Sequence, residues 1–260
     1  MRVLFLGDIV GRPGRRAVKE LLPSLYEEYD PHLVIANGEN AAGGNGITRK
    51  TADEIFLSGV DILTMGNHVW DQKEVYDFID EEDRIIRPAN YPPDTPGRGY
   101  VITYSRDNSK VGIINLSGRV YLPALDCPFR MLDEILPIIN KQTKVIIVDF
   151  HAEATSEKMA LAWYADGRVS VVIGTHTHIQ TADERILPGG TGYITDAGMT
   201  GPQNSILGVK VEAVLEKFLT QRPVRFEVAS GPVQLNAIYL EIDNEKGITT
   251  TIKRIQVTKN

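Results

Sequence analysis

The sequence predicts an α/β fold, in which a parallel or mixed sheet is flanked by helices and the end of the chain completes a second sheet. Short β-branched runs alternate with segments of helical period as far as Pro223. After Pro223 the pattern changes to runs that predict antiparallel strands joined by turns. No change of composition and no linker divides the 260 residues. We therefore expect one domain over residues 1–260, long enough to bury a large core.

The apolar runs define the expected elements. Strands are predicted over residues 3–6, 32–36, 61–65, 111–116, 144–150, 170–173 and 192–195, and antiparallel strands over 225–228, 235–242 and 248–255. Val18, Leu21, Leu22 and Leu25 recur at helical spacing after Pro13, which favours a helix there. Further helices are predicted over residues 50–58, 73–79, 131–139, 157–164 and 211–219. The proline-rich stretch 90–99 predicts a loop.

Bulk properties exclude several classes of partner. The formal net charge of −6 provides no basic field, so we expect no stable complex with long nucleic acid. Cys127 is the only cysteine and cannot form an intrachain disulfide. The N-terminus has no signal-peptide pattern, and no apolar run approaches the roughly 20 residues of a membrane span. We expect a cytoplasmic protein that does not associate with membranes.

Residues capable of metal chemistry follow the predicted strands. They are Asp8, Glu39, Asn40, Asn67, His68, His151, His176 and His178, and they include four of the five histidines. In α/β sheets the carboxyl ends of the strands form the ligand-binding edge. Taken singly, Asp8 could cap a helix, the asparagines could be turn residues, and each histidine could be an interior hydrogen-bonded one. Their common position at one edge favours a site, whereas His32 has no partner motif and is expected to be structural.

The residue types indicate a first-row transition-metal site. Two carboxylates, two amides and three imidazoles form a mixed oxygen and nitrogen donor set without a thiolate. One ion would not use all of these groups. A carboxylate such as Glu39 can bridge two ions, and ions roughly 3.5–4 Å apart form the pair used in phosphoester displacement.

These motifs resemble those of calcineurin-like metallophosphoesterases, and the resemblance covers the whole chain. It is carried by Gly7-Asp8, Gly38-Glu39-Asn40, Gly66-Asn67-His68, His151 and Gly174-Thr175-His176-Thr177-His178. It is strongest to the YmdB-type branch of bacterial phosphodiesterases, through the blocks at residues 37–42, 64–68, 149–158 and 195–202. The resemblance implies the metallophosphoesterase fold, in which two mixed β-sheets are sandwiched between α-helices as four layers, α/β/β/α.

The resemblance also implies roles for the site residues. One ion would be held by Asp8, Glu39, Asn40 and His178, and a second by Glu39, Asn67, His151 and His176, with Glu39 as the bridge. The wider superfamily begins with Asp-x-His, whereas Ile9 and Val10 follow Asp8 here, and Asn40 would replace the missing ligand. His68 would donate a proton to the leaving group. The acidic residue that often follows this histidine is Val69, so the sequence does not show what orients His68.

The activity implied is phosphodiester hydrolysis of small nucleotides, with 2′,3′-cyclic nucleotides as the leading substrates, by a metal-activated water. A phosphomonoesterase or a nuclease for short RNA with the same site is the alternative. The resemblance favours iron as the metal, then manganese, with zinc also suited to the ligands. A homo-oligomer would be compatible with the sequence. Trp70, Tyr91 and Trp163 could stack on a base, although aromatic side chains more often lie in the core.

Two other functions fit parts of the sequence less well. A metal-free nucleotide-binding module could use the Gly11-Arg12-Pro13-Gly14 run, but this run lacks the Gly-x-Gly-x-x-Gly spacing, and Pro13 removes an amide donor. A metal-dependent amidohydrolase can also use a His-x-His pair. Such enzymes carry the pair on the first strand of an eight-stranded barrel, whereas His176 and His178 come late in this chain.

Overall fold

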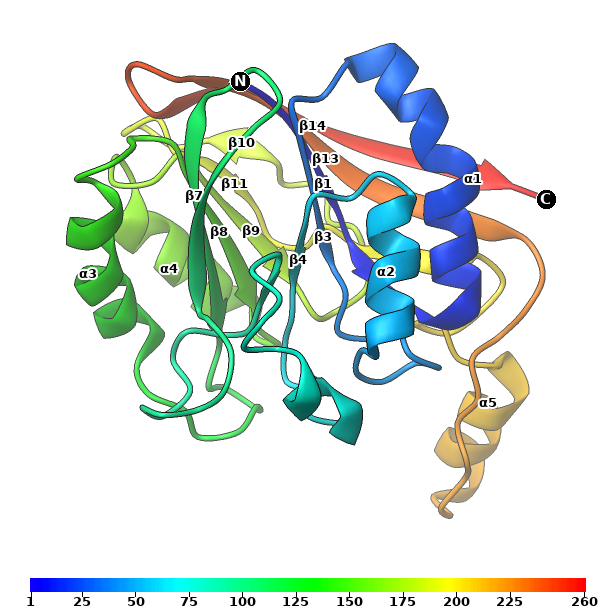
Figure 1. Ribbon diagram of the computed structural model, residues 1–260. Coiled ribbons are helices and arrows are strands. Elements are labelled where there is room, and N and C mark those ends of the chain that lie inside the picture. The colour runs from blue at the N-terminus through cyan, green and yellow to red at the C-terminus, as the bar shows by residue number, and fades with distance from the viewer.

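The computed structural model describes residues 1–260 and contains two β-sheets that pack face to face between helices (Figure 1). The first sheet contains β1 (Arg2–Leu6), β2 (Asp8–Ile9), β3 (Leu33–Asn37), β4 (Ile62–Thr64), β5 (Ile85–Ile86), β12 (Met199–Pro202), β13 (Val233–Asp243) and β14 (Ile248–Lys259). The second contains β6 (Tyr100–Tyr104), β7 (Lys110–Ser117), β8 (Ile146–His151), β9 (Val171–Thr175), β10 (Arg185–Ile186) and β11 (Gly192–Ile194).

Five α-helices and one 3₁₀ helix accompany the sheets. They are α1 (Gly11–Tyr29), α2 (Arg49–Leu57), η1 (Lys73–Asp77), α3 (Pro128–Ile139), α4 (Thr155–Ala165) and α5 (Val211–Thr220). In Figure 1, α1 and α2 cover the outer face of the first sheet, and α3 and α4 cover that of the second. Helix α5 projects from the body. No helix has both the length and the apolar character needed to cross a membrane.

The alternation of side chains along the strands explains the four layers. In β1, Val3 and Phe5 point into the core between the sheets, where they meet residues such as Ile147 of β8. The intervening Leu4 and Leu6 belong to the core shared with α1 and α2. Because successive side chains point to opposite faces, a strand that is apolar at every position must be covered on both sides. The predicted α/β/β/α arrangement is confirmed.

The second sheet is built in the same way. Ile114 and Leu116 of β7 and Val148 of β8 face a third core that contains Leu132 of α3 and Leu161 of α4. Strands β7, β8, β9 and β11 are parallel, and β6 and β10 are antiparallel edge strands. In the first sheet, β1, β3, β4 and β5 are parallel.

The prediction that the last strands complete the second sheet is wrong, because they extend the first. Strand β13 pairs antiparallel with β1 and with β14. Its two faces explain this position, since Ile238 and Leu240 lie in the core between the sheets and Leu235 and Ala237 in the core under α1. A strand that is apolar on both faces suits an inner position, and the open side of β1 supplies it.

Two further predictions need correction. Residues 225–228 were expected to form a strand but run as an unpaired segment, in which Val228 alone forms a bridge, to Val209. The segment is mostly exposed and has no neighbouring strand to accept its hydrogen bonds. The helix predicted over residues 73–79 is shorter, because only residues 73–77 are helical, as the 3₁₀ helix η1. The other predicted strands and helices and the 90–99 loop are confirmed, with shifts of a few residues at their ends.

Candidate metal centre

The predicted site residues lie where the carboxyl ends of strands from both sheets meet. Glu39 and Asn40 follow β3, Asn67 and His68 follow β4, His151 ends β8, and His176 and His178 follow β9. Asp8 follows β1, as expected, and it also opens the short strand β2, which pairs with β12. The two sheets thus contribute residues to one site. We call Asp8, Glu39, Asn40, Asn67, His151, His176 and His178 the candidate ligands.

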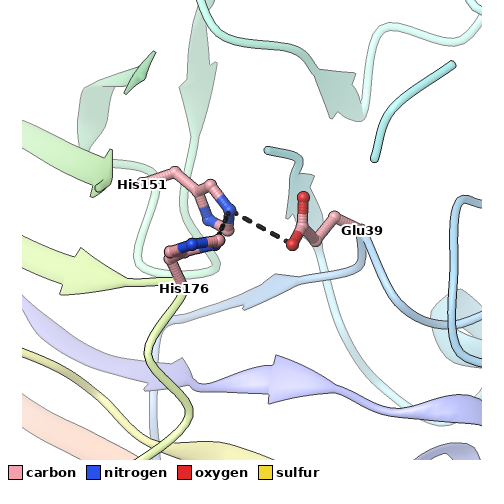
Figure 2. Close-up of side chains that lie close together, drawn as sticks. All are labelled: Glu39, His151 and His176. Atoms are coloured by element: carbon pink, nitrogen blue, oxygen red, sulfur yellow. Dashed lines mark hydrogen bonds and ion pairs between the residues drawn. The ribbon is translucent and has the colours of Figure 1, made fainter. Parts of the chain in front are cut away.

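His151 is the centre of a first group of contacts. Its Nε2 lies 3.1 Å from Glu39 Oε1, 3.1 Å from Asn67 Oδ1 and 3.0 Å from His176 Nδ1. Figure 2 shows the His151 ring between Glu39 and His176. One ligand atom from each of Glu39, His151 and His176 lies within 4.8 Å of the others, so these three side chains could hold one ion.

A second group includes Asp8, Asn40 and His178. Asn40 Nδ2 lies 3.2 Å from both Glu39 Oε1 and His178 Nε2, and His178 Nε2 lies 3.8 Å from Asp8 Oδ1. Glu39 therefore contacts both groups. Each group thus contains Glu39 and three further candidate ligands.

The ring nitrogens that face away from these groups each have an acceptor. His151 Nδ1 lies 2.9 Å from Thr175 Oγ1, His176 Nε2 lies 3.1 Å from Glu153 Oε2, and His178 Nδ1 donates to the Leu207 carbonyl at 3.1 Å. In a neutral imidazole such a hydrogen bond selects the tautomer whose inward nitrogen carries the lone pair. The three imidazoles are thus oriented as metal ligands are.

Thr175 links His151 to a buried carboxylate in the core. Its hydroxyl donates to Asp149 Oδ1 at 2.7 Å while its oxygen faces His151 Nδ1. Asp149 is fully buried, which raises the pKa of its carboxyl group, and it also accepts a hydrogen bond from Asn37 Nδ2 at 3.1 Å. This buried chain of hydrogen bonds restricts rotation of the His151 ring.

The His176-Thr177-His178 loop has an unusual backbone, which is held by hydrogen bonds to a buried ion pair. His176 and His178 have φ values of 96° and 64°, in the left-handed region that costs a non-glycine residue about 1–3 kcal/mol. Between them, the Thr177 backbone N–H and hydroxyl both donate to Asp196 Oδ2, at 3.1 and 2.6 Å. The same oxygen accepts from Lys158 Nζ at 2.7 Å, and Lys158 and Asp196 are both fully buried. This ion pair holds the loop in place.

His68 has the orienting partner that the sequence did not show. Its Nδ1 lies 2.7 Å from Asp71 Oδ2, three residues further along the chain. The His68 backbone N–H also donates to Glu39 Oε2 at 3.0 Å, which ties this residue to the site. The imidazole itself forms no hydrogen bond or ion pair with the candidate ligands of either group. It stands beside them at the edge of the cavity.

Burial and mutual charge displace the pKa values of the site strongly. Burial raises the pKa of Asp8 to about 6, although His178 and His151 act against it. Burial also acts to raise the pKa of Glu39, but the neighbouring His151 lowers it to about 2. For His151, burial is outweighed by Glu39, which raises the pKa to about 9. Burial and the charge on His151 lower the pKa of His176 to about 3. Such a spread among adjacent buried groups is typical of functional sites.

Two observations show that the site fits a cation. Asp8 Oδ1 is the only buried side-chain oxygen or nitrogen in the structure without a hydrogen-bond partner, and a carboxylate oxygen left in this state is costly. Gly66 leaves no spare room beside the ligands. A Cβ atom at this position would lie 2.3 Å from Glu39 Oε2 and from His151 Nε2.

The site opens into a cavity of about 710 Å³, within the roughly 300–1,000 Å³ common for small-molecule sites. Glu39, Asn40, His68, His176 and His178 line one part of it. The cavity wall contains no lysine and no arginine.

Sequence reasoning missed the residues that orient the ligands. Asp71, Glu153, Thr175 and Asp196 contact site residues but belong to no metal-binding pattern. The spacing of Asp71 from His68 was the one available signal, since residues three apart can meet in a turn. The aromatic residues Trp70 and Tyr91 pack against the core under α1 instead of lining the cavity.

The two-sheet fold and the cluster of carboxylate, amide and imidazole groups at its strand ends define a metallophosphoesterase-like protein with residues suited to divalent metal ions. The model of the YmdB-like protein family matches residues 4–255. The chain belongs to this family.

Individual relatives agree with this assignment. The chain is 54% identical to the 2′,3′-cyclic-nucleotide 2′-phosphodiesterase of Bacillus subtilis (strain 168), over 99% of this chain and 97% of that protein. A crystal structure of a hypothetical protein from Thermus thermophilus matches with a TM-score of 0.93 and 45% identity over 100% of both chains. A novel phosphatase from Mycoplasma pneumoniae matches with a TM-score of 0.93 and 34% identity, over 99% of this chain and 93% of that one.

Proposed function

We propose that this protein is a dinuclear-metal phosphodiesterase that hydrolyses small nucleotide phosphodiesters, with 2′,3′-cyclic nucleotides as the preferred substrates. The observation that carries the proposal is the pair of contact groups that share Glu39 at the base of the cavity. The B. subtilis relative, which is named for this activity and is similar over almost its whole length, supports the substrate class.

In this proposal Asp8, Glu39, Asn40 and His178 hold one ion, and Glu39, Asn67, His151 and His176 hold the other. Turning the Asn40 amide by 180° would present its oxygen at the point where its nitrogen now faces Glu39 and His178. Bound cations would lower the pKa of a water toward about 7 and offset the charge that develops on the phosphate oxygens. We propose iron as the metal, then manganese or zinc, since all three accept this donor set.

The chain's own contribution to the chemistry is to orient groups and to supply a proton. The Asp71 carboxylate accepts the Nδ1 hydrogen of His68, which leaves Nε2 to face the cavity. When the P–O bond breaks, the leaving ribose oxygen is a strongly basic alkoxide and departs more easily with a proton. A protonated His68 would donate this proton, a contribution of roughly 10²–10⁴-fold in rate.

The charge of the cavity favours a diester over a monoester. A phosphodiester carries one negative charge, whereas a monoester carries up to two at neutral pH. The cavity offers no lysine or arginine to a second charge, and Glu153 and Glu227 lie on its wall. The same lining disfavours a polyanionic RNA, so the monoesterase and short-RNA nuclease alternatives are less well supported.

The test combines metal analysis with a substrate panel. Protein purified without added metal should contain about two equivalents of transition metal and should open 2′,3′-cyclic AMP faster than it cleaves p-nitrophenyl phosphate or a short RNA. Rapid monoester cleavage without opening of any 2′,3′-cyclic nucleotide would refute the diester assignment.

The role of His68 is tested by replacement. His68→Ala should keep its metal but lose about 10²–10⁴-fold in turnover of 2′,3′-cyclic AMP. His32→Ala is the matched control, because His32 pairs with Asp107 and does not line the cavity. Loss of metal from His68→Ala would instead make this residue a ligand.

A further inference from the structure

We propose that the phenyl ring of Phe226 is the platform on which the base of the nucleotide substrate stacks. The inference rests on the proposed function and adds a second subsite, for the uncharged end of the substrate, to the phosphate site at the candidate ligands.

The cavity has two chemically different regions. Its polar region includes His68 and four of the candidate ligands, Glu39, Asn40, His176 and His178. Its apolar region is formed by residues from one later part of the chain: Leu207, Val209, Phe226 and Val228. A nucleotide has the same division, because its phosphate is anionic and its base is a flat ring with two apolar faces. A ligand that occupies both regions would therefore place its phosphate at the ligands and its base at the apolar wall.

Phe226 is the only phenylalanine, tyrosine or tryptophan in the cavity wall. It is 51% exposed, so much of the phenyl surface is open to a ligand. A base covering this surface would remove it from water and add stacking, which is sequence-tolerant because every base has a π-face. The other aromatic side chains near the site pack against one another. Trp70 stacks on Tyr76 with ring centroids 5.1 Å apart and meets the edge of Tyr91.

The apolar wall is fixed to the metal site through the backbone. The Leu207 carbonyl accepts the hydrogen of His178 Nδ1, so one residue of the wall directly orients a candidate ligand. Two hydrogen bonds join the chain before α5 to the chain after it. Lys210 N–H donates to the Glu227 carbonyl at 3.0 Å, and Ala229 N–H donates to the Gly208 carbonyl at 2.9 Å. Phe226 directly precedes Glu227, so these hydrogen bonds restrain its backbone, while α5 projects from the body (Figure 1).

Two glycines beside the apolar wall leave space for a base. Gly43 and Gly44 line the cavity without side chains, and a Cβ atom at Gly44 would lie 3.0 Å from Val228 Cγ2. Glu153 and Glu227 also line the cavity. Glu227 forms an ion pair with Lys210, and Glu153 Oε2 lies 3.1 Å from His176 Nε2. The wall around Phe226 therefore has apolar side chains, and the adjacent Glu227 is already paired with Lys210. We expect purine and pyrimidine substrates to be accepted alike.

The experiment compares one substrate with and without its base. Steady-state rates of metal-loaded wild type, Phe226→Ala, Phe226→Trp and Phe218→Ala are measured on 2′,3′-cyclic AMP and on methyl ribofuranoside 2′,3′-cyclic phosphate. Both substrates have the same leaving group and the same strained ring. Phe218 of α5 is the control. It is 72% exposed and lies in the same part of the chain as Phe226, but it does not line the cavity.

Phe226→Ala should raise KM for 2′,3′-cyclic AMP on the order of tenfold with little change in kcat, as expected for lost uniform binding. The base-free substrate should be nearly unaffected, Phe226→Trp should restore the affinity, and Phe218→Ala should resemble wild type. Equal effects of Phe226→Ala on both substrates, or no effect on either, would overturn the inference.

A direct binding measurement separates this inference from the proposed function. If wild-type protein opens no 2′,3′-cyclic nucleotide, the proposed function fails, and the platform is judged by calorimetric binding of 3′-AMP and ribose 3-phosphate. Weaker binding of 3′-AMP alone by Phe226→Ala would support the platform. Unchanged binding of both compounds would refute it.

Discussion

Replacement of Asp8 by asparagine should stabilise the metal-free protein. The Asp8 carboxyl group is fully buried, Oδ2 accepts the His176 backbone N–H at 3.3 Å, and Oδ1 has no partner. An asparagine could keep the first contact through its oxygen. Its amide nitrogen could donate toward His178 Nε2, which lies 3.8 Å from Oδ1. The variant thus removes a buried charge with little change of shape.

The magnitude follows from the pKa of Asp8. A pKa of about 6 in the folded state, against the ordinary 3.8, means that the folded protein binds this proton more tightly than the unfolded chain. The contribution of Asp8 to stability is therefore present below pH 4 and is lost as the pH rises to 6, by about 3 kcal/mol. Asp8→Asn avoids this loss, so its advantage over wild type should grow from about pH 4 and reach about 3 kcal/mol above pH 6.

Thermal unfolding in the presence of a chelator at pH 4.5 and pH 8 measures the effect. At pH 8 the variant should melt roughly 6–12 °C above wild type, and at pH 4.5 the gap should be much smaller. With Mn²⁺ at about one thousand times its Kd the order should reverse, because an ion that binds only the native state then stabilises wild type by about 4.1 kcal/mol, more than the advantage of the variant. Asp53→Asn, at an exposed position, should show neither effect. A variant that is less stable than wild type at pH 8 without metal would refute the reasoning.

Three other substitutions test separate parts of the structure. Gly66→Ala should fold but lose metal, measured by elemental analysis, because its methyl group would enter the ligand cluster; retention of two equivalents would contradict this. Lys158→Met should lower the free energy of unfolding by about 3–5 kcal/mol, measured with urea, by leaving the buried Asp196 unpaired, and adding Asp196→Asn should restore part of the loss. Asp71→Ala should slow opening of 2′,3′-cyclic AMP roughly tenfold, through misorientation of His68. Its cleavage of bis(p-nitrophenyl) phosphate, whose leaving group needs no proton, should change little, and equal losses on both substrates would argue against this role.

The sequence was informative where local pattern and chemistry coincide. Buried parallel strands are continuous apolar runs, and the polar residues that interrupt them, such as Glu39 and His151, were therefore placed at strand ends correctly. Which distant strands pair with each other was harder to predict from the sequence. The long runs that became β13 and β14 could have joined either sheet, and only the open side of β1 decides the question.

The contacts that orient the candidate ligands could not be predicted from the sequence for a related reason. Glu153 contacts His176, and Asp196 contacts Thr177, across distant parts of the sequence. The loop that makes these contacts has two histidines at positive φ, a conformation that the hydrophobic pattern does not indicate. Phe226 lies in a segment whose composition suggests a strand but which has no strand beside it. Its position on the cavity wall depends on how the chain returns from α5.

The absence of lysine and arginine from the cavity wall has a consequence for regulation. A site that carried its own fixed cations would retain phosphate compounds in any metal state. Here the affinity for an anion has to come almost entirely from the ions that the protein acquires. Metal supply would then determine whether the nucleotide is captured at all, and depletion of metal would leave a folded protein that ignores its substrate.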